Sequence, residues 1–409
     1  MDEGELIHDW NRQAHGNPSP PRAPELNDET LRDGLQNPSV LDPPIEDKLR
    51  ILHYMAELGI ESANIGLPGA GPRATEHVER LAREIVDQGL PMVANCAART
   101  VVADVRPIAE VSQRVGLPLE ASTFIGSSPI RQYAEGWTLD DMLRTSEEAV
   151  RFAVGEGLPV MFVTEDTTRA RPDALKSLYG RAIEWGARRL CLADTVGHAT
   201  PDGTRNLVRF VRDEIVAPSG EDVQVDWHGH RDRGLGLANA LAAMEAGADR
   251  IHGTALGIGE RVGNVEMELL LVNLHLLGIR QGTLEALPDY CRTVAEACGV
   301  AVAPGYPVVG KDAFRTATGV HASAIIKAEE KGDAWLADRI YSGIPASLVG
   351  RAQEIEVGPM SGLSNVRHWL RSRGYDASDD DLCRRILDAA KGSSRTLPPE
   401  ELDALAQKG

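Results

Sequence analysis

The sequence predicts an α/β protein: a (β/α)8 TIM barrel, then a small mixed subdomain and a short helical C-terminal region. Runs with strand character and amphipathic helical runs alternate about eight times over roughly 240 residues, the number and length typical of such barrels. Polar clusters follow the apolar runs directly, where barrel enzymes carry their chemistry. The alternative, an open doubly wound sheet, is disfavoured because no glycine-rich fingerprint follows the first strand.

The sequence predicts an N-terminal arm followed by eight strand and helix pairs. Residues 1–21 are polar with clustered prolines and predict a mobile N-terminal arm, and the catalytic barrel is expected over 22–281. The expected barrel strands are Pro24–Thr30, Ser62–Leu67, Met92–Ala97, Leu119–Phe124, Val160–Thr164, Arg189–Thr195, Val223–His230 and Arg250–Leu256. The expected helices between them include Ile45–Leu58, Ala74–Gln88, Leu139–Gly155, Pro172–Trp185, Thr204–Ile215 and Gly236–Ala246.

The chain after the barrel predicts two further regions. A helix over 268–277 closes the barrel, and Gly278 and Gly282 end it. Residues 282–364 mix glycine, proline and short helical pieces, which indicates a linker or arm subdomain. Two or three short helices are expected over 365–409.

Composition limits the classes of function. Hydrophobic residues make up 42% and charged residues 25% of the 409 residues, which is ordinary for a soluble globular protein. A net charge of −18 argues against a nucleic-acid partner, which would need a basic surface. The five cysteines have irregular spacing without a C-x-x-C pair and suggest reduced thiols. We expect a cytoplasmic enzyme with neither a nucleic-acid nor a membrane partner.

Two histidines spaced i, i+2 end the seventh predicted strand. His228 and His230 therefore point to the same face, where they can offer two imidazoles to one metal ion. Asp33, after the first strand, would supply a third ligand from the same rim of the barrel. One carboxylate, two imidazoles and open positions suit a catalytic divalent ion such as Zn, Mn or Mg. The plainer alternatives are two polar residues at a strand end and a structural ion pair of Asp33 with Arg32.

The motifs together resemble one enzyme family. The segments Thr30–Gly34, His228–His230 and Gly257–Asn264 resemble the 2-isopropylmalate synthase and homocitrate synthase family, and 165–169, 193–201 and 318–322 agree with it. The resemblance extends from about residue 24 to 365. It implies a metal-dependent acyltransferase that condenses acetyl-CoA with a 2-oxo acid, converts the acyl group to an alkyl group, and hydrolyses the thioester. It also implies a homodimer in which the arm of one subunit reaches over the barrel of the other.

The resemblance implies roles for particular side chains in the barrel. Asp33, His228, His230 and Asn264 resemble the metal ligands. Arg32 is similar to the arginine that binds the 2-oxo group and steadies the developing alkoxide. Substrate contacts are expected from Thr195 and Gln36, and Glu165 resembles an acid that orders the pocket, although it could also cap its strand.

Further roles concern acetyl-CoA and the arm. Gly257, Gly259 and Gly263 resemble a turn that lets the backbone approach acetyl-CoA; next to it, Glu260 and Arg261 could be only an ion pair that shapes the turn. His321 resembles the base, or part of a relay, that removes a proton from the acetyl methyl group, with Tyr341 as its companion. Without its Thr-Gly-Val-His-Ala context, His321 would more often be an ordinary surface or core histidine.

The identity of the 2-oxo acid is a finer question. Val101, Met161 and Val163 are apolar where homocitrate synthases are expected to hold a second carboxylate, and a buried carboxylate without partners is costly. This favours an aliphatic substrate such as 2-oxoisovalerate, hence a 2-isopropylmalate synthase-like step of amino-acid biosynthesis. The same reaction on another 2-oxo acid, by a homocitrate, citramalate, phosphonomethylmalate or phosphinomethylmalate synthase, is the alternative.

Two features leave other functions open. Arg231 stands where the family pattern has Asn; its charge could repel the metal or serve an anionic substrate, or its side chain could simply point away, because it alternates with His230. A lyase of the 3-hydroxy-3-methylglutaryl-CoA type would share the first motif and His-x-His, but would need a cysteine in the loop after strand eight, which here reads Gly-Glu-Arg-Val-Gly-Asn. A non-catalytic barrel that serves as a binding protein is the remaining alternative.

Overall fold

The computed structural model describes residues 6–9, 11 and 22–407, so most of the predicted mobile arm of residues 1–21 lies outside the described residues. The described chain forms two compact units. The barrel unit comprises residues 22–38, Ile60–Leu270 and Leu277–Gln281. The second unit comprises Ser39–Gly59, Leu271–Leu276 and residues 282–407. The domain boundaries expected from the sequence at 281/282 and 364/365 remain a prediction.

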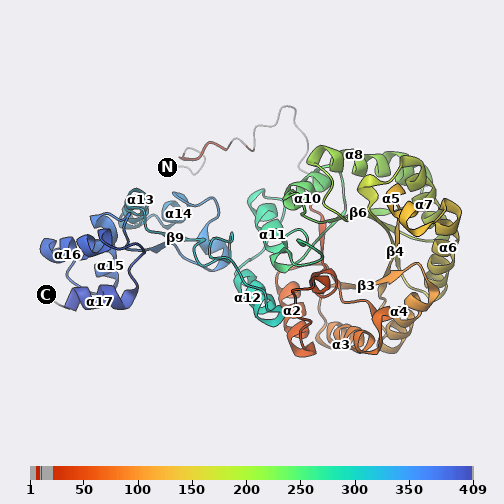
Figure 1. The fold of residues 1–409 in the computed structure, drawn as a ribbon, viewed down its shortest axis with the longest axis horizontal. Helices are drawn as coiled ribbons and strands as arrows, with labels where there is room; N and C mark the ends of the chain where they lie inside the picture. The colour runs from red at the N-terminus through yellow and green to blue at the C-terminus, as the bar shows by residue number, and fades with distance from the viewer. Residues whose placement is uncertain (1–5, 10, 12–21, 408–409) are drawn as a thin grey trace. The chain divides into compact units, whose positions relative to one another are not determined.

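Eight parallel strands close into a barrel in chain order, with β1 paired to both β2 and β8 (Figure 1). The TIM-barrel prediction is therefore confirmed. The strands are β1 (Glu25–Asp28), β2 (Ser62–Asn64), β3 (Val93–Arg99), β4 (Glu120–Gly126), β5 (Val160–Glu165), β6 (Arg189–Asp194), β7 (Gln224–Gly229) and β8 (Arg250–Gly253). Each overlaps a strand expected from the sequence.

Helices alternate with the strands along the chain. They are α2 (Ile45–Glu57), α3 (Pro72–Gln88), α4 (Val102–Val115), α5 (Pro129–Glu135), α6 (Leu139–Gly155), α7 (Pro172–Trp185), α8 (Pro201–Val211), α9 (Ala217–Ser219), α10 (Gly236–Glu245) and α11 (Met267–Leu276). A π-helical segment over Arg212–Val216 continues α8. Short 3-10 turns follow several strands, at Asp33–Gln36, Pro68–Ala70, Thr167–Arg169 and Ala255–Gly257.

The two sides of β7 show how the barrel interior differs from its exterior. Val225 and Trp227 are fully buried on one side of the strand, and Asp226 and His228 alternate with them on the other. Asp226 bonds Arg250 of β8 at 2.6 Å, and Arg250 also reaches Glu120 of β4 at 2.7 Å, across the barrel. The inside of the barrel is therefore a charged layer, above which the strand ends carry the candidate site.

Besides α2 and the end of α11, the second unit contains six further helices among the described residues. They are α12 (Leu287–Cys298), α13 (Gly319–Glu330), α14 (Ala334–Arg339), α15 (Leu363–Ser372), α16 (Asp380–Lys391) and α17 (Pro399–Gln407), with a 3-10 turn at Ala346–Val349. Two short strands, β9 (Arg315–Thr316) and β10 (Glu354–Ile355), pair in parallel. The predicted short helices at the C-terminus are present as α15, α16 and α17.

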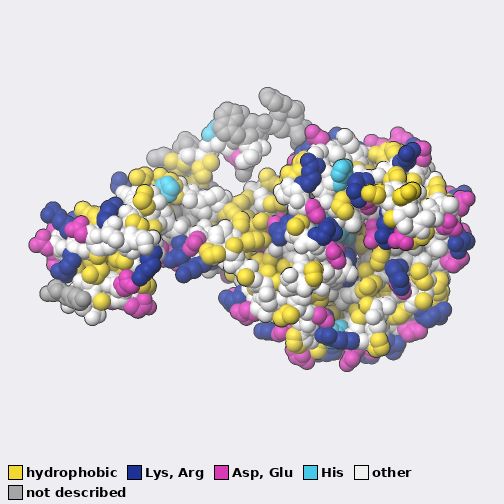
Figure 2. All heavy atoms as spheres, viewed as in Figure 1, with side chains coloured by type: hydrophobic (Ala, Val, Ile, Leu, Met, Phe, Trp, Pro, Cys, Tyr) yellow, Lys and Arg dark blue, Asp and Glu magenta, His cyan; other side chains and the backbone are white. Residues whose placement is uncertain are grey.

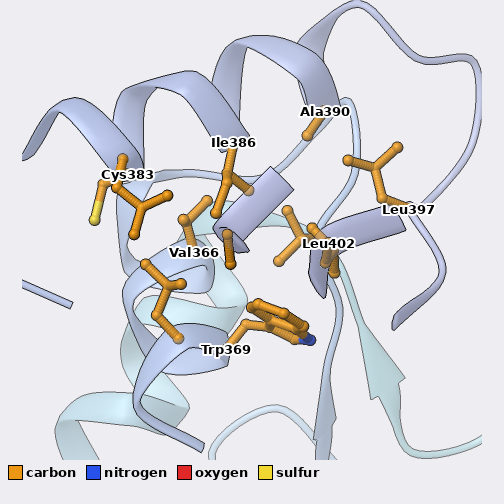
Figure 3. Packing of buried hydrophobic residues seen from close by; sticks show 11 residues of the cluster. Val366, Trp369, Cys383, Ile386, Ala390, Leu397 and Leu402 are labelled. Atoms are coloured by element: carbon orange, nitrogen blue, oxygen red, sulfur yellow. The ribbon is translucent and has the colours of Figure 1, made fainter. Parts of the chain in front are cut away.

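The three C-terminal helices bury a hydrophobic core of their own. Val366 and Trp369 of α15, Ile386 of α16 and Leu402 of α17 point toward one another (Figure 3). The amphipathic spacing on each helix brings these side chains to one face, which explains their mutual burial. Among the described residues, no helix combines the length and the apolar character needed to cross a membrane.

Candidate metal and substrate site

A cavity of about 260 Å³ lies within the barrel unit, at the carboxyl ends of the strands. Glu165 ends β5, Thr195 follows β6, and His228 lies near the end of β7, so the wall is built from strand ends as in other barrel enzymes. The lining residues are Glu29, Arg32, Asp33, Gln36, Asn64, Leu67, Ala97, Ser122, Phe124, Met161, Val163, Glu165, Cys191, Ala193, Thr195, His228, His230, His252, Glu260 and Arg261. On the drawn outer face of the barrel, acidic and basic side chains are interspersed (Figure 2).

Asp33, His228 and His230 converge in this cavity. His228 Nε2 lies 3.5 Å and His230 Nε2 lies 3.8 Å from Asp33 Oδ2, and the two imidazole nitrogens are 3.3 Å apart. All three side chains are buried. The 3-10 turn after β1 carries the carboxylate and β7 carries the histidines, so the closed barrel brings together groups almost 200 residues apart in sequence.

Asn264 lies directly beside these three groups. Its Nδ2 donates to Asp33 Oδ1 at 2.9 Å, and its backbone pairs with that of His230. Its Oδ1 is buried with no hydrogen-bond partner among the described residues, and an unpaired buried acceptor is costly. One carboxylate, two imidazoles and one amide oxygen fit a divalent cation.

The charges of the cluster also suit a cation. Burial would raise the pKa of Asp33, but Arg32 and His228 outweigh it and hold that pKa well below the usual range. Burial lowers the pKa of His230 to about 4, helped by the neighbouring His228. At neutral pH the carboxylate is therefore ionised and the imidazole of His230 neutral, which are the forms that bind metals.

Arg32 is held between two carboxylates. Its Nη1 donates to Asp33 Oδ2 at 3.0 Å and its Nη2 to Glu29 Oε2 at 2.5 Å, while its buried Nε has no hydrogen-bond partner among the described residues. Burial would raise the pKa of Glu29, but Arg32 and His252 lower it to about 2. Arg32 thus lies in the cavity wall beside Asp33, His228 and His230 as a fixed cation.

The other predicted substrate contacts also lie in the cavity wall. Gln36 ends the 3-10 turn that begins at Asp33. Thr195 accepts a hydrogen bond at its Oγ1 from the Asp166 amide at 2.8 Å. Burial raises the pKa of Glu165, so its carboxyl group keeps a proton to higher pH than an exposed glutamate.

The apolar residues expected to determine substrate specificity line two different cavities. Met161 and Val163 line the cavity together with Leu67 and Phe124. Val101 is instead 45% exposed and lines a neighbouring cavity of about 390 Å³, which shares Phe124 and Glu165 with the first. Met161 and Val163 therefore remain candidates for contact with a substrate side chain in the first cavity, whereas Val101 does not line it.

The glycine turn after β8 has no room for side chains. Gly257, Gly259 and Gly263 have φ values of +60°, +142° and +94°, a region that favours glycine. A Cβ on Gly263 would lie 1.8 Å from the Gly257 carbonyl oxygen, and one on Gly259 would lie 2.1 Å from Asn264 Nδ2. The turn therefore packs tightly against Asn264 and Asp33, and its contact with acetyl-CoA stays a prediction.

The two arginines flanking the site point in different directions. Arg231 pairs with Glu266 and donates from Nε to the Val262 carbonyl at 2.8 Å, so the expectation that its side chain points away from His230 is confirmed. Arg261 lines the cavity and pairs with Asp232 at 2.9 Å, and no ion pair between Arg261 and Glu260, the plainer alternative from the sequence, is seen among the described residues. No described contact places the Arg231 guanidinium in the cavity wall.

His321 and Tyr341 belong to the second unit. Their rings stack with centroids 4.0 Å apart at an interplanar angle of 27°, and the phenol ring is 47% exposed. The structure thus places the two rings in contact, and their part in the reaction stays a prediction.

Three buried groups next to the site were missed from the sequence. His252 of β8 lies with Nε2 2.9 Å from Asp226 Oδ2 and Nδ1 3.1 Å from Glu29 Oε1. Burial would lower the pKa of His252, but Asp226 and Glu29 raise it. The alternation of Arg250 and His252 along a strand was the available signal, because it places two polar side chains on the inner face of the barrel.

Comparisons with known proteins agree with the fold and the motifs. Residues 23–294 match the family model described as HMGL-like. A putative (R)-citramalate synthase of Methanopyrus kandleri is 32% identical over 97% of this chain and 74% of its own length. A probable 2-isopropylmalate synthase of Ignicoccus hospitalis is 32% identical over 91% of this chain and 88% of its own length, and a Methanopyrus kandleri homocitrate synthase is 34% identical over 89% and 86%.

Solved structures resemble the barrel at lower identity. The HMG-CoA lyase of Bacillus subtilis superposes with a TM-score of 0.56 at 20% identity, covering 68% of this chain and 95% of the lyase. The carboxyl transferase domain of Rhizobium etli pyruvate carboxylase gives a TM-score of 0.52 at 15% identity, over 95% of this chain and 68% of that chain. At these identities the likeness concerns the fold.

Proposed function

The chain belongs to the HMGL-like family, together with 2-isopropylmalate, homocitrate and citramalate synthases, and on that premise we propose that it condenses acetyl-CoA with a 2-oxo acid. Hydrolysis of the thioester then releases free CoA and a 2-hydroxy-2-carboxymethyl acid. The single observation that carries the proposal is the convergence of Asp33, His228 and His230 beside the fixed cation of Arg32.

In the proposed reaction, groups in the cavity wall bind the metal ion, stabilise the developing charge and hold the substrate. Asp33, His228, His230 and Asn264 would hold a divalent ion (Zn, Mn or Mg), which supplies Lewis-acid stabilisation of negative charge. Arg32 donates to the keto oxygen as charge grows there during attack by the acetyl carbanion. Thr195 and Gln36 hold the substrate carboxylate, which orients the keto carbon for attack.

Removal of the acetyl proton needs a general base, and we assign this role to His321, which is stacked on Tyr341. Gly257, Gly259 and Gly263 let the backbone approach acetyl-CoA. The proposed assembly is a homodimer in which the arm with His321 serves the partner's barrel. We place the enzyme in the cytoplasm, without a nucleic-acid or membrane partner.

An aliphatic 2-oxo acid such as 2-oxoisovalerate suits the cavity best. Leu67, Phe124, Met161 and Val163 provide an apolar wall. The polar wall contains four carboxyl groups, those of Glu29, Asp33, Glu165 and Glu260. It contains two guanidinium groups, those of Arg32 and Arg261. This excess of acid favours a bound cation and disfavours a substrate with a second anionic group, because like charges repel in a site of low dielectric.

The alternatives are weaker on specific grounds. A lyase of the HMG-CoA type would need a cysteine in the loop after β8, where this chain has Gly257–Asn264, and the three relatives described above have synthase names. A non-catalytic barrel has no need for three mutually close ligand atoms. Pyruvate, 2-oxoglutarate and a phosphono- or phosphino-pyruvate remain alternative substrates of the same reaction.

The test is release of free CoA from acetyl-CoA by metal-loaded protein. It is screened over pyruvate, 2-oxoisovalerate, 2-oxoglutarate, oxaloacetate and phosphonopyruvate, with the lyase substrate 3-hydroxy-3-methylglutaryl-CoA as a separate arm. We expect the largest kcat/KM with 2-oxoisovalerate and loss of activity in Asp33→Asn. Protein that binds no divalent ion after dialysis and loading would remove the proposal, and mixing Arg32→Ala with His321→Ala subunits tests the shared site through recovered activity.

A further inference from the structure

A chain of alternating charges runs through the barrel unit from its interior to Arg32. Arg189 Nη1 pairs with Asp226 Oδ1 at 2.8 Å, and Asp226 Oδ2 faces His252 Nε2 at 2.9 Å. His252 Nδ1 lies 3.1 Å from Glu29 Oε1, and Glu29 Oε2 accepts from Arg32 Nη2 at 2.5 Å. The link between His252 and Glu29 is a close contact in which Nδ1 makes no hydrogen bond among the described residues, and the other links are hydrogen bonds or ion pairs.

Within this chain, the two oxygens of Glu29 have separate partners. Oε1 accepts from Asn27 Nδ2 at 2.9 Å and faces His252, whereas Oε2 is left for Arg32. Asn27 is itself held, because its Oδ1 accepts from Ser62 Oγ and Asn95 Nδ2, both at 2.7 Å. The carboxylate is therefore fixed on one side by the barrel interior and presents its other oxygen to the substrate-binding guanidinium.

We infer that Glu29, anchored by His252 and Asp226, is the positioning residue that orients Arg32 toward the 2-oxo acid. The inference rests on the proposed function, which makes Arg32 the group that binds the keto oxygen. With Nη1 on Asp33 and Nη2 on Glu29, rotation of the guanidinium is blocked at both ends. A long arginine side chain loses little further freedom on binding when its planar group is already held.

A different role for the same residues has to be distinguished. Glu29, His228 and His252 also bring one potential ligand atom each within 4.8 Å of one another, so Glu29 could itself bind the ion. We prefer positioning because both Glu29 oxygens already accept hydrogen bonds, from Asn27 and Arg32, and His252 Nε2 already faces Asp226. The two roles differ in what the loss of the Glu29 charge does to ion affinity.

The experiment compares Glu29→Gln, Glu29→Asp and the control Glu245→Gln in full-length, metal-loaded protein. Glu245 ends α10 and pairs with Arg205, outside the chain of charges, so the control removes the same charge and one ion pair from the barrel unit. Mn²⁺ affinity is measured by competition with a chromophoric chelator and 2-oxoisovalerate affinity by calorimetry. Kinetics give KM for acetyl-CoA and kcat separately.

For Glu29→Gln we expect the Mn²⁺ affinity and the KM for acetyl-CoA to be unchanged. The affinity for the 2-oxo acid should be at least about tenfold weaker, because one charge-assisted hydrogen bond contributes roughly that factor. Glu29→Asp keeps the charge and should retain part of the affinity. His252→Gln should act in the same direction, and adding it to Glu29→Gln should cost nothing more if it works through Glu29.

Three results would overturn the inference in distinguishable ways. Weaker Mn²⁺ binding by Glu29→Gln would make Glu29 a ligand. Equal 2-oxo acid affinity in wild type and Glu29→Gln would show that Arg32 needs no positioning, while the proposed function stands. Wild-type protein that binds Mn²⁺ but none of the screened 2-oxo acids would remove the proposed function and this inference with it.

Discussion

Replacing Arg231 by Asn tests whether that arginine acts on the metal site or only on the turn beside it. Its guanidinium pairs with Glu266 and donates to the Val262 carbonyl at 2.8 Å, and the two side chains are 27% and 14% exposed. Hydrogen bonds of charged groups contribute about 1.5–3 kcal/mol, so we expect Arg231→Asn to lower the free energy of unfolding by about 2 kcal/mol. For a unit of this size that corresponds to a melting temperature lower by roughly 4–8 °C.

The matched control is Arg233→Asn, which removes the same charge two residues away. The Arg233 side chain is exposed and makes one hydrogen bond, from Nη1 to the His198 carbonyl at 2.7 Å, so its loss should cost about 0–1 kcal/mol. Thermal unfolding measures stability, and chelator competition measures Mn²⁺ affinity. We expect both variants to bind Mn²⁺ as wild type does. Tighter binding in Arg231→Asn alone would show that the guanidinium repels the ion and would refute our interpretation of its orientation.

Two further predictions concern the turn and the cavity acid. Gly263→Ala would place a Cβ against the Gly257 carbonyl at a positive φ, so we expect it to lower the free energy of unfolding, measured by chemical denaturation, by at least about 2 kcal/mol. The control Gly220→Ala should lower it by roughly 1 kcal/mol, because no described atom lies within 4 Å of the new Cβ there. Equal losses in the two variants would contradict the tight turn. Because burial raises the pKa of Glu165, its ionisation costs stability as pH rises through that pKa, so Glu165→Gln should raise the melting temperature more at pH 7 than at pH 4, and the opposite trend would count against this burial effect.

Most of the barrel could be predicted because each strand is a short apolar run followed by polar residues. The exceptions have local causes. The helix α4, over Val102–Val115, is not among the helices named from the sequence; it contains Pro107, which removes a backbone donor and weakens the helical pattern. The helix α5, over Pro129–Glu135, has only seven residues and buries none of them, so it lacks an apolar stripe to detect.

The convergence of Asp33, His228 and His230 could be predicted because these residues lie at strand ends and the spacing of the two histidines places both on one face. Glu29 and His252 could not, because their contact depends on how β1 and β8 align across the closure of the barrel. The observed register pairs Asn27 with His252 and Asp28 with Gly253. A shift of one residue would turn His252 away from the interior, and nothing in either strand alone sets that alignment.

The charged interior of the barrel orients the side chains at the strand ends. Arg250 is 1% exposed and bonds Asp226, Glu120 and Ser62, in a position where TIM barrels usually pack branched apolar side chains. Buried ion pairs are rarely more stabilising than apolar packing of the same volume, so stability does not explain this layer. The charged layer is explained by the orientation that it gives to the site residues. Arg250 and Arg189 keep Asp226 ionised and fixed, and Asp226 in turn holds the His252 imidazole that faces Glu29. An apolar layer would leave His252 without a carboxylate to hold it. Because each group has its partner before any ligand arrives, the cost of orienting Arg32 is met when the barrel folds and not when the substrate binds.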